Sequence, residues 1–348
     1  MSVQATIQAQ LSYQPYHRLF RQPLQTHHGL WQQRDGILLR LRDRDGRVGY
    51  GEIAPIDWFG SESWAEALAW CQAHSGWLDL SNLDGIPLAM TATRFGLSCA
   101  GQDLHQDPAD LLDWDQHSPI PMCGLLGSCR GAFAALESFS QPEQWGAFKL
   151  KIGLEDPALE QDQIRRLLAY LPAGIPVRLD ANGGLNPAQL EAWLQAEDLF
   201  QRIEFIEQPL PPDGFEAMLQ ASQPGRIPLA LDESVAGLAQ LSQCYERGWR
   251  QLVVLKPAIS GSVGEWVENK ALHALDRVVS AAFETVVGTY HAARLTRLHR
   301  LDQRAVGFGL DHWLAADGGN PVDPFRVGLL AARQHFEAVW VALGGQHD

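Results

Sequence analysis

Short apolar runs alternate with longer amphipathic segments from about residue 118 onward. Eight such runs occur: PMCGLLG, GAFKLKIG, IPVRLDAN, IEFIEQPL, IPLALDES, QLVVLKPA, RVVSAAFE and AVGFGLD. Strands and helices in alternation form βα units around a parallel sheet, and eight such units suggest a closed barrel. The pattern therefore predicts a (β/α)8-type barrel over residues 118–320.

Two of the intervening segments carry clear signals for the start of a helix. Asp156 can cap a helix whose first residue is Pro157, and apolar residues then recur at helical spacing as far as Leu171. Asn186 stands before Pro187 in the same way. We expect a helix to begin at each of these two prolines.

The first 117 residues follow a different order. The stretch GILLRLRDRDGRVGYGEIAP predicts two strands joined by a turn at RDGR, and SWAEALAWCQA and MTATRFGLSCAGQDL predict helices after them. Strands first and helices afterwards indicate an α+β domain over residues 1–117. The tail, residues 321–348, contains AVWVAL, which we interpret as a strand that packs back on this domain.

Ionisable residues stand at the ends of five successive predicted strands: Lys151, Asp180, Glu207, Asp232 and Lys256. Neighbouring members of this set are about one βα unit apart in the sequence. The carboxyl ends of the strands converge at one mouth of such a barrel, where enzymes with this fold keep their active sites. A lone aspartate after a strand is most often a helix cap, but five ionisable groups in phase indicate a catalytic site.

The three carboxylates predict a divalent metal ion. In a low-dielectric funnel they would repel one another unless a cation joined them, and hard oxygen ligands suit Mg²⁺, with Mn²⁺ as a possible substitute. These strand ends carry no Cys or His, so zinc and iron fit poorly. Glu233, next to Asp232, is an alternative third ligand, although Asp232 keeps the phase of Asp180 and Glu207.

The stretch FKLKIG places two lysines on one face of a strand. Phe148, Leu150 and Ile152 alternate with Lys149 and Lys151. We expect the apolar face to pack under the surrounding helices and both lysines to point into the mouth. Lys149 and the metal ion disfavour a charged Lys151, and lysines tuned in this way reach a pKa of roughly 7–8, which suits a general base.

Composition narrows the possible partners. Hydrophobic residues make up 46% of the 348-residue chain and charged residues 20%, as in globular proteins, and the net charge is −14. An acidic chain without a basic cluster argues against nucleic acid and anionic membranes, but not against a small carboxylate substrate. No signal peptide, apolar run of about 20 residues or CxxC pair is visible, so we expect a cytoplasmic protein with five reduced cysteines. The sequence does not define the oligomeric state.

The ordered motifs KLK, DAN, EQP, DES and LKP resemble the enolase superfamily, in particular its muconate-lactonising branch with a lysine on each side of the site. The resemblance covers residues 119–312 and the N-terminal GYGEIAP, which is similar to the capping domain of that superfamily. A lysine base beside Mg²⁺ is an arrangement known in this superfamily. The resemblance implies that Asp180, Glu207 and Asp232 bind the metal and that Lys151 is the acid/base.

Within that branch, GEIAP, CGLLG, LKPAISGS and GFGLD are similar to the o-succinylbenzoate synthase family. This resemblance implies syn-dehydration of 2-succinyl-6-hydroxy-2,4-cyclohexadiene-1-carboxylate to 2-succinylbenzoate through an enediolate, a step toward menaquinone or phylloquinone. Lys256 is then the second lysine, and Lys149 and Asn182 support the site. The substrate contacts implied are Ser262, Gly288 and Thr285.

Two positions depart from the pattern of that family and concern fine specificity. Thr285 stands where serine is more frequent, and His312 stands where threonine is more frequent. The resemblance to a capping domain also makes Trp58 and Phe59, together with residues 26–28 (THH), candidates for loops that close over the mouth.

Other functions remain open at this point. A dipeptide epimerase, an N-acylamino acid racemase or a cycloisomerase of the same branch would use the same lysines and carboxylates. Against the epimerase, only Asp311 is acidic near the eighth run, where we expect a pair of acidic residues. A sugar-acid enzyme would need a His–Asp pair in place of Lys256, and His291 falls in a predicted helix. A barrel that binds Mg²⁺ and an anion without catalysis is a further alternative.

Overall fold

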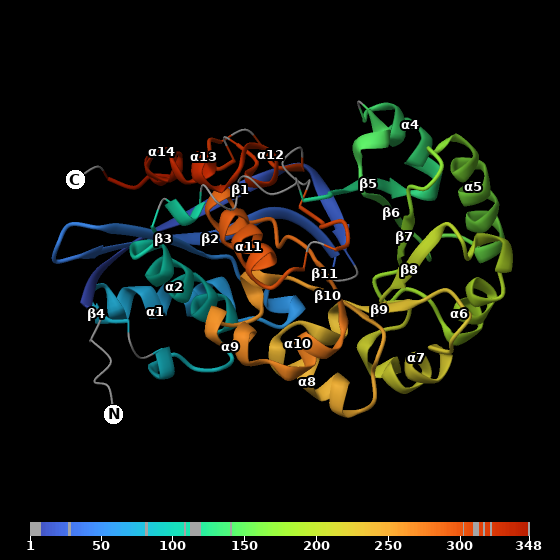
Figure 1. Cartoon of the computed structure of the whole chain (residues 1–348), viewed down its shortest axis with the longest axis horizontal. Coiled ribbons are helices and arrows are strands. Elements are labelled where there is room, and N and C mark those ends of the chain that lie inside the picture. The colour runs from blue at the N-terminus through green and yellow to red at the C-terminus, as the bar shows by residue number, and fades with distance from the viewer. Residues whose placement is uncertain are drawn as a thin grey trace.

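A computed structural model describes residues 8–26, 29–80, 83–107, 109–111, 120–139, 141–301, 303–308, 313–315, 317–320 and 322–346. We call residues 8–111 the cap and residues 120–308 the barrel. The cap is an antiparallel sheet with helices against it, and the barrel is a curled parallel sheet with helices on its outside (Figure 1). The predicted class, a (β/α)8-type barrel with an N-terminal α+β cap, is confirmed.

The cap sheet has the strand order β3-β2-β1-β4. Its elements are β1 (Gln8–Thr26), β2 (Gly29–Asp43), β3 (Val48–Ile53), α1 (Trp64–His74), β4 (Gly76–Asp79) and α2 (Thr91–Leu104). Helix α2 packs tightly on β3 at two glycines. A Cβ at Gly49 would lie 2.3 Å from the Ala100 carbonyl oxygen, and a Cβ at Gly51 would lie 2.1 Å from that of Gly96. The GYGE stretch therefore allows the close approach of this helix.

The barrel sheet runs β11-β10-β9-β8-β7-β6-β5, and all of its neighbouring strands are parallel. The strands are β5 (Cys123–Ser128), β6 (Ala147–Lys151), β7 (Val177–Asp180), β8 (Ile203–Glu207), β9 (Leu229–Leu231), β10 (Leu252–Leu255) and β11 (Asp276–Val279). The helices are α4 (Ala132–Glu137), α5 (Pro157–Tyr170), α6 (Pro187–Leu194), α7 (Phe215–Ala221), α8 (Leu238–Glu246), α9 (Val263–Glu268), α10 (Lys270–Ala274) and α11 (Val286–Leu298).

The eighth apolar run closes the barrel through two single bridges. Val306 pairs with Met122 beside β5, and Gly307 pairs with Ser280 beside β11. The Val306 amide donates to the Pro121 carbonyl at 2.8 Å, and the Gly307 amide donates to the Val279 carbonyl at 2.9 Å. This segment thus occupies the eighth position without forming a regular strand in the described part of the run. The end of the run, residues 309–311, lies outside the described residues.

Both predicted helix starts are confirmed. Asp156 caps α5 and accepts a hydrogen bond from the Ala158 amide. Asn186 caps α6, and its side chain and that of Gln189 form a reciprocal capping box.

Alternation along the strands separates two cores. Inside the barrel, the buried cluster consists of Phe205, Ala230, Leu252, Val254 and Val278. On the outside, Phe148, Leu150 and Ile152 of the FKLKIG stretch are buried, as predicted. The ring of Phe148 packs against Phe139, with ring centroids 5.2 Å apart. The lysines of this stretch are thereby left facing the barrel interior.

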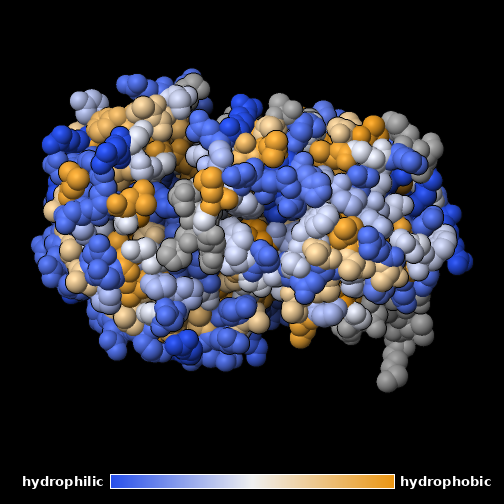
Figure 2. Space-filling model, turned by 180° about the vertical axis from the view of Figure 1, so that it is seen from behind, coloured by the Kyte–Doolittle hydropathy of each residue, from blue (hydrophilic) through white to orange (hydrophobic). Residues whose placement is uncertain are grey.

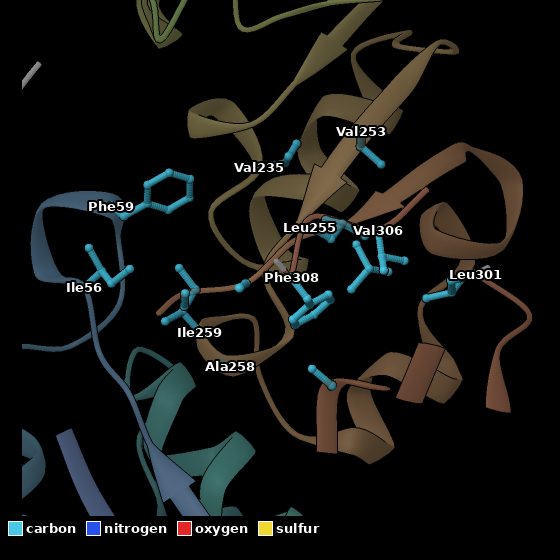
Figure 3. Packing of buried hydrophobic residues seen from close by; sticks show 14 of the residues in the cluster. Ile56, Phe59, Val235, Val253, Leu255, Ala258, Ile259, Leu301, Val306 and Phe308 are labelled. Atoms are coloured by element: carbon cyan, nitrogen blue, oxygen red, sulfur yellow. The ribbon is translucent and has the colours of Figure 1, made fainter. Parts of the chain in front are cut away.

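The cap and the barrel share one large hydrophobic core. In Figure 3, Ile56 and Phe59 of the cap face Val235 and Ile259 of the barrel. On the molecular face shown in Figure 2, hydrophobic residues are scattered among hydrophilic ones. Among the described helices, none is long and apolar enough to cross a membrane.

The predicted strand in AVWVAL is wrong. The tail forms three helices, which are α12 (Pro324–Val327), α13 (Leu329–Arg333) and α14 (Phe336–Ala342). Phe336, Val339 and Trp340 are buried at helical spacing, and a run of six apolar residues fits a short helix as well as a strand. The rings of Phe336 and Trp340 contact Tyr50 of β3.

The extent of each domain remains a prediction. The predicted boundary between residues 117 and 118 lies outside the described residues, within 112–119. The tail contacts the cap through an ion pair of 2.7 Å between Arg333 Nε and Asp103 Oδ1.

Candidate active site

A cavity of about 190 Å³ lies at the carboxyl ends of the barrel strands, beneath the cap. The strand-end residues singled out by the sequence all line it, and they are Lys149, Lys151, Asp180, Asn182, Glu207, Asp232 and Lys256. The cap contributes Trp31, Ile56, Trp58 and Phe59. Residues far apart in the sequence are thus brought into one pocket because the barrel strands end on the same side.

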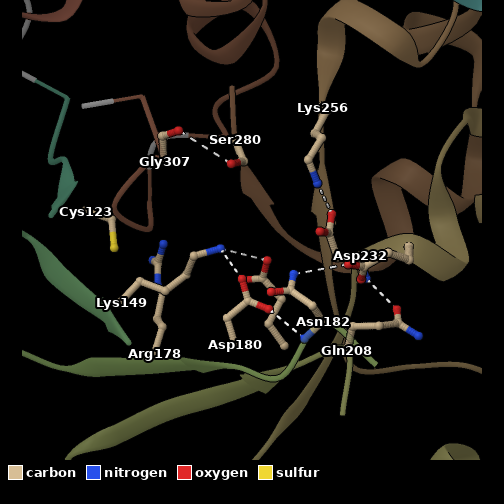
Figure 4. A network of polar contacts seen from close by, with 12 residues as sticks. Cys123, Lys149, Arg178, Asp180, Asn182, Gln208, Asp232, Lys256, Ser280 and Gly307 are labelled. Carbon is tan, nitrogen blue, oxygen red and sulfur yellow. Dashed lines mark hydrogen bonds and ion pairs between the residues drawn. The ribbon is translucent and has the colours of Figure 1, made fainter. Parts of the chain in front are cut away.

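Lys149 is held between two carboxylates. Its Nζ lies 2.7 Å from Asp180 Oδ2 and 3.0 Å from Glu207 Oε1 (Figure 4). Burial alone would lower the pKa of Lys149, but the charges of Asp180 and Glu207 outweigh burial and raise it well above its usual value. Lys149 therefore keeps its charge, which is the state that its predicted supporting role requires.

Burial disfavours the charged form of two of the strand-end carboxylates. Burial, followed by the charge of Asp180, raises the pKa of Glu207 to about 7. Burial also raises the pKa of Asp232 to about 7, against the opposing charge of Lys256. Carboxyl groups with pKa values raised in this way take up a proton near neutrality unless a cation binds beside them.

Lys256 follows β10, and its side chain contacts one residue of the barrel and one of the cap. Its Nζ donates to Asp232 Oδ1, and it lies 3.9 Å from the centroid of the Phe59 ring. A cation over an aromatic face is attracted by the ring quadrupole, which places partial negative charge on that face. One cap residue therefore contacts one of the two predicted catalytic lysines directly.

Gln208, which follows Glu207, fixes the position of Asp232. Its Oε1 accepts hydrogen bonds from the amides of Asp232 at 2.9 Å and Ser234 at 3.1 Å. Its Nε2 donates to Ser234 Oγ at 2.8 Å. This role was not predicted, and its only signal in the sequence is the position of Gln208 beside a strand-end carboxylate in EQP.

Asn182 joins two of the acidic positions. Its backbone N–H donates to Asp180 Oδ1 at 3.0 Å, and its side-chain Nδ2 donates to Glu233 Oε1 at 3.1 Å. The backbone φ of Asn182 is +45°, a left-handed conformation that Asn adopts more readily than most residues. Glu233 and Asp232 both line the cavity, so the choice of Asp232 as the third ligand remains a prediction.

Glu160 of α5 organises the loop that follows Lys151. Its carboxylate accepts hydrogen bonds from three successive amides, those of Gly153 at 2.9 Å, Leu154 at 3.0 Å and Glu155 at 3.2 Å. Gly153 has a φ of +78°, which a glycine adopts without strain. This buried carboxylate therefore fixes the backbone beside a predicted catalytic lysine, and helical spacing alone gave no sign of it.

Arg178 was also missed, although VRLD places it two residues before Asp180 on the same strand face. Its side chain lines the cavity below Asp180. Its Nε donates to Glu204 Oε2 at 2.7 Å, and its Nη1 donates to the Ala305 carbonyl at 2.7 Å. The arginine thereby fills the barrel interior beneath the carboxylates.

The donor set fits Mg²⁺, although the lysines hold part of it. In the described part of the chain, no three His, Cys, Asp or Glu side chains form a ready-made metal site. Lys149 and Lys256 instead hold oxygens of Asp180, Glu207 and Asp232. Three buried carboxylates that converge on one cavity offer the hard oxygen ligands that a divalent cation such as Mg²⁺ prefers.

The three residues predicted to contact substrate are not among those lining the cavity. Ser262 caps α9 and accepts a hydrogen bond from the Glu265 amide. Thr285 and the amide of Gly288 donate to Glu52 of the cap. These positions are engaged in local structure, and their direct contact with substrate stays a prediction.

The remaining candidates divide into three groups. Trp58 and Phe59 line the cavity, as the resemblance to a capping domain implied. His291 is buried in α11, where its Nε2 donates to the Tyr50 carbonyl at 2.8 Å, in agreement with a structural role. Residues 27 and 28, Asp311 and His312 lie outside the described residues, as does the side chain of residue 26.

Two family models match the chain. Residues 134–288 match the enolase C-terminal domain-like family. Residues 19–104 match the family described as MenC, N-terminal domain. The two matches fall in the barrel and in the cap, respectively.

Curated and structural relatives extend this result over nearly the whole chain. An o-succinylbenzoate synthase from Thermosynechococcus vestitus is 38% identical over 338 residues, which cover 94% of this chain and 97% of that protein. One from Klebsiella pneumoniae is 31% identical over 75% of this chain and 78% of that protein.

A solved structure agrees with these relatives. The crystal structure of o-succinylbenzoate synthase from Thermosynechococcus elongatus, complexed with Mg in the active site, has a TM-score of 0.77 and 34% sequence identity to this chain. The match covers 94% of this chain and 99% of that one. The chain belongs to the o-succinylbenzoate synthase family of the enolase superfamily.

Proposed function

We propose that this chain catalyses the Mg²⁺-dependent dehydration of 2-succinyl-6-hydroxy-2,4-cyclohexadiene-1-carboxylate to 2-succinylbenzoate. The observation that carries the proposal is the meeting of Lys151, Lys256 and three strand-end carboxylates in one cavity, in a chain of this family. This reaction places the chain in menaquinone or phylloquinone biosynthesis.

Asp180, Glu207 and Asp232 would hold the magnesium ion. The ion, when bound, supplies positive charge close to the substrate carboxylate, where negative charge develops as the neighbouring carbon loses its proton. Lys149 then offsets the negative charge of Asp180 and Glu207 from the other side. Asn182 and Gln208 keep the strand-end backbone in register for this arrangement.

Lys151 is the residue that moves the proton. As a neutral amine, its Nζ takes the proton from the carbon next to the substrate carboxylate. The resulting ammonium returns that proton to the departing hydroxyl group on the same face of the ring. One C–H bond and one C–O bond break, one water molecule leaves, and the ring becomes aromatic.

Lys256 works as an ammonium group on the opposite side. Asp232 and the Phe59 ring hold its Nζ in place. Its charge offsets the negative charge that spreads into the ring system of the substrate. Trp31, Trp58 and Phe59 of the cap cover the cavity and exclude water from it.

The decisive experiment compares substrate classes with one purified protein. We expect dehydration of the succinyl cyclohexadiene carboxylate with Mg²⁺, followed through the absorbance of the aromatic product, and loss of activity on chelation. A dipeptide panel and an N-acylamino acid panel, assayed for deuterium exchange at the α-carbon, serve as the comparison. Exchange in either panel without dehydration would favour an epimerase or a racemase, and no turnover in any assay would favour a binding protein.

The cellular location remains a prediction, and the oligomeric state is a separate question. The cytoplasmic location can be checked by fractionation of cells that express the protein. The oligomeric state, which neither the sequence nor a single chain defines, can be checked by light scattering.

A further inference from the structure

One wall of the cavity comes from the loop between β11 and α11. Ala281, Ala282 and Phe283 line the cavity there. Phe283 has a φ of +58°, in the left-handed region that bulky residues rarely adopt. Backbone strain of this kind persists only where the surroundings impose it, and it is common beside functional sites.

Arg34 of β2 holds one side of this loop. The arginine is 1% exposed, and its Nε donates to the Ala282 carbonyl of the barrel at 2.9 Å. Its two terminal nitrogens donate to the cap carbonyls of Ala54 at 2.5 Å and Pro55 at 2.7 Å. These cap residues lead directly into Ile56, which lines the cavity. One guanidinium therefore fixes a cap segment and a barrel segment relative to each other.

Glu52 of β3 holds the other side. It is also 1% exposed. Its carboxylate accepts hydrogen bonds from the amide of Thr285 at 2.9 Å, from the Thr285 hydroxyl and from the amide of Gly288 at 2.9 Å. The hydroxyl of Tyr16 donates to Glu52 Oε1, the oxygen that also accepts from the Thr285 amide. A carboxylate of the cap thus satisfies free amides at the start of a barrel helix, where negative charge is favoured.

The two contacts flank the strained residue in the sequence. Arg34 bonds the residue before Phe283, and Glu52 bonds Thr285, two residues after it. The Phe283 ring in turn packs edge-on against two cap rings, those of Trp31 at 5.4 Å and Phe20 at 5.1 Å between centroids. The cap therefore contacts both the backbone and the side chain of this wall, in addition to Glu284 of the barrel, which accepts a hydrogen bond from the Ala282 amide at 2.5 Å.

We propose that Glu52 and Arg34 are positioning residues that hold residues 281–283 in the conformation that the substrate meets. They act through the loop and do not line the cavity themselves. This inference rests on the proposed function and deepens it, because it assigns the shape of one side of the substrate pocket to two buried charges of the cap.

The test replaces Glu52 with Gln, which keeps the shape of the side chain but removes its charge and half of its acceptors. We expect hydrogen exchange of peptides covering residues 280–290 to rise at least about tenfold, since a buried donor is left without a partner. In the dehydration assay, we expect KM to rise about tenfold with a smaller change in kcat, because the lysines and the metal-binding carboxylates keep their places.

Glu265→Gln is the matched control. Glu265 of α9 also joins the barrel to the cap, through Arg94 at 3.1 Å, but it lies outside the cavity lining. It should leave KM and the exchange of residues 280–290 unchanged. Arg34→Lys, which cannot bond the carbonyls of Ala282, Ala54 and Pro55 together, should reproduce the Glu52→Gln effects from the other side of the loop even if Glu52→Gln fails to fold.

The outcomes separate this inference from the proposed function. Faster exchange in residues 280–290 together with a raised KM supports it. Unchanged exchange, or faster exchange with unchanged KM and kcat, overturns it, as does an equal effect of Glu265→Gln. If the wild-type protein does not dehydrate the substrate, the proposed function fails, while the exchange measurement still decides whether Glu52 holds the loop.

Discussion

The buried carboxylates at the strand ends of the barrel and the buried carboxylate of Glu52 in the cap serve the molecule in different ways. At the strand ends of the barrel, Glu207 and Asp232 are held by lysine ammonium groups, and burial raises the pKa of each to about 7. In the cap, Glu52 is equally buried, but its oxygens accept hydrogen bonds from the amides and hydroxyl groups of fixed residues.

The two kinds of carboxylate differ in whether their hydrogen-bond partners can be replaced by another cation. A lysine side chain is long and has several rotatable bonds, so its ammonium group can leave a carboxylate when another cation arrives. Backbone amides at the start of a helix cannot leave without unfolding that helix. The strand-end set is therefore suited to receive a metal ion and substrate, and Glu52 is suited to join two domains permanently.

The largest effect expected from the exchangeable set is the loss of its base. Lys151→Ala should lower kcat by about 10³-fold at saturating Mg²⁺, within the 10²–10⁴-fold range of general acid–base catalysis. Thermal unfolding should change little. Lys270→Ala, at an exposed position of α10, controls for the loss of a lysine, and near wild-type turnover of Lys151→Ala would disprove the assignment.

Asp180→Asn tests whether the strand-end carboxylates bind the metal. We expect Mg²⁺ affinity, measured by titration calorimetry, to fall roughly 100-fold or more, since groups that only support metal ligands are worth about 10–100-fold. Asp213→Asn, at an exposed position close to the site, should bind Mg²⁺ as the wild type does. Equal affinity in both variants would remove Asp180 from the ligand set.

Lys149→Met compares the strand-end carboxylates with Glu52 by the effect of Mg²⁺ on the free energy of unfolding. Without metal at pH 8, we expect the free energy of unfolding to fall by about 3–5 kcal/mol, because two buried carboxylates lose a partner. Saturating Mg²⁺ should recover a large part of this loss in urea denaturation. Any stability lost in Glu52→Gln should persist with Mg²⁺, and recovery of both variants to the same extent would contradict the distinction.

A smaller effect on stability is expected from pH, through His291, which lies where the barrel meets the cap. Burial, helped by the nearby Arg294, lowers the pKa of His291 to about 3, so the folded protein keeps this ring neutral. The unfolded chain takes up a proton below about pH 6.5. Stability therefore falls with decreasing pH, by about 1 kcal/mol between pH 6.5 and 5.5.

His291→Gln keeps a donor near the Tyr50 carbonyl but cannot take up a proton. Denaturation at a series of pH values should show a shallower loss of stability for this variant between pH 6.5 and 5.5. His74→Gln, at an exposed position of α1, should leave the slope as it is. Parallel slopes for His291→Gln and the wild type would show that this ring does not contribute to the acid sensitivity.

The strand-end residues could be predicted because the period of the βα units places them in one mouth. Lys151 and Asp180 needed only that period and the two-residue alternation of a strand. Both helix caps, Asp156 and Asn186, were likewise set by their immediate neighbours. Local sequence was therefore sufficient to predict most of the barrel strands and helices and the strand-end lysines and carboxylates of the site.

Features that depend on distant partners could not be predicted in this way. The orientation of Thr285 follows from Glu52, which lies 233 positions away in the sequence. Arg34 gives no local sign that it bonds Ala282 of the barrel. The tail helix α14 was mistaken for a strand because its apolar run is too short to distinguish the two periods.

The described part of the eighth run joins its neighbours through single bridges at Val306 and Gly307. Within the part of the chain that the structure describes, which leaves out residues 309–312, every other junction between neighbouring barrel strands has at least two paired positions, whereas each side of this join has one. Ser280 and Gly307, which form one of these bridges, also line the cavity. Local opening takes place where the hydrogen-bond network is thinnest. We therefore expect the barrel to open locally between residues 306–307 and the two neighbouring strands. Local unfolding of the barrel would then begin at residues that line its own pocket.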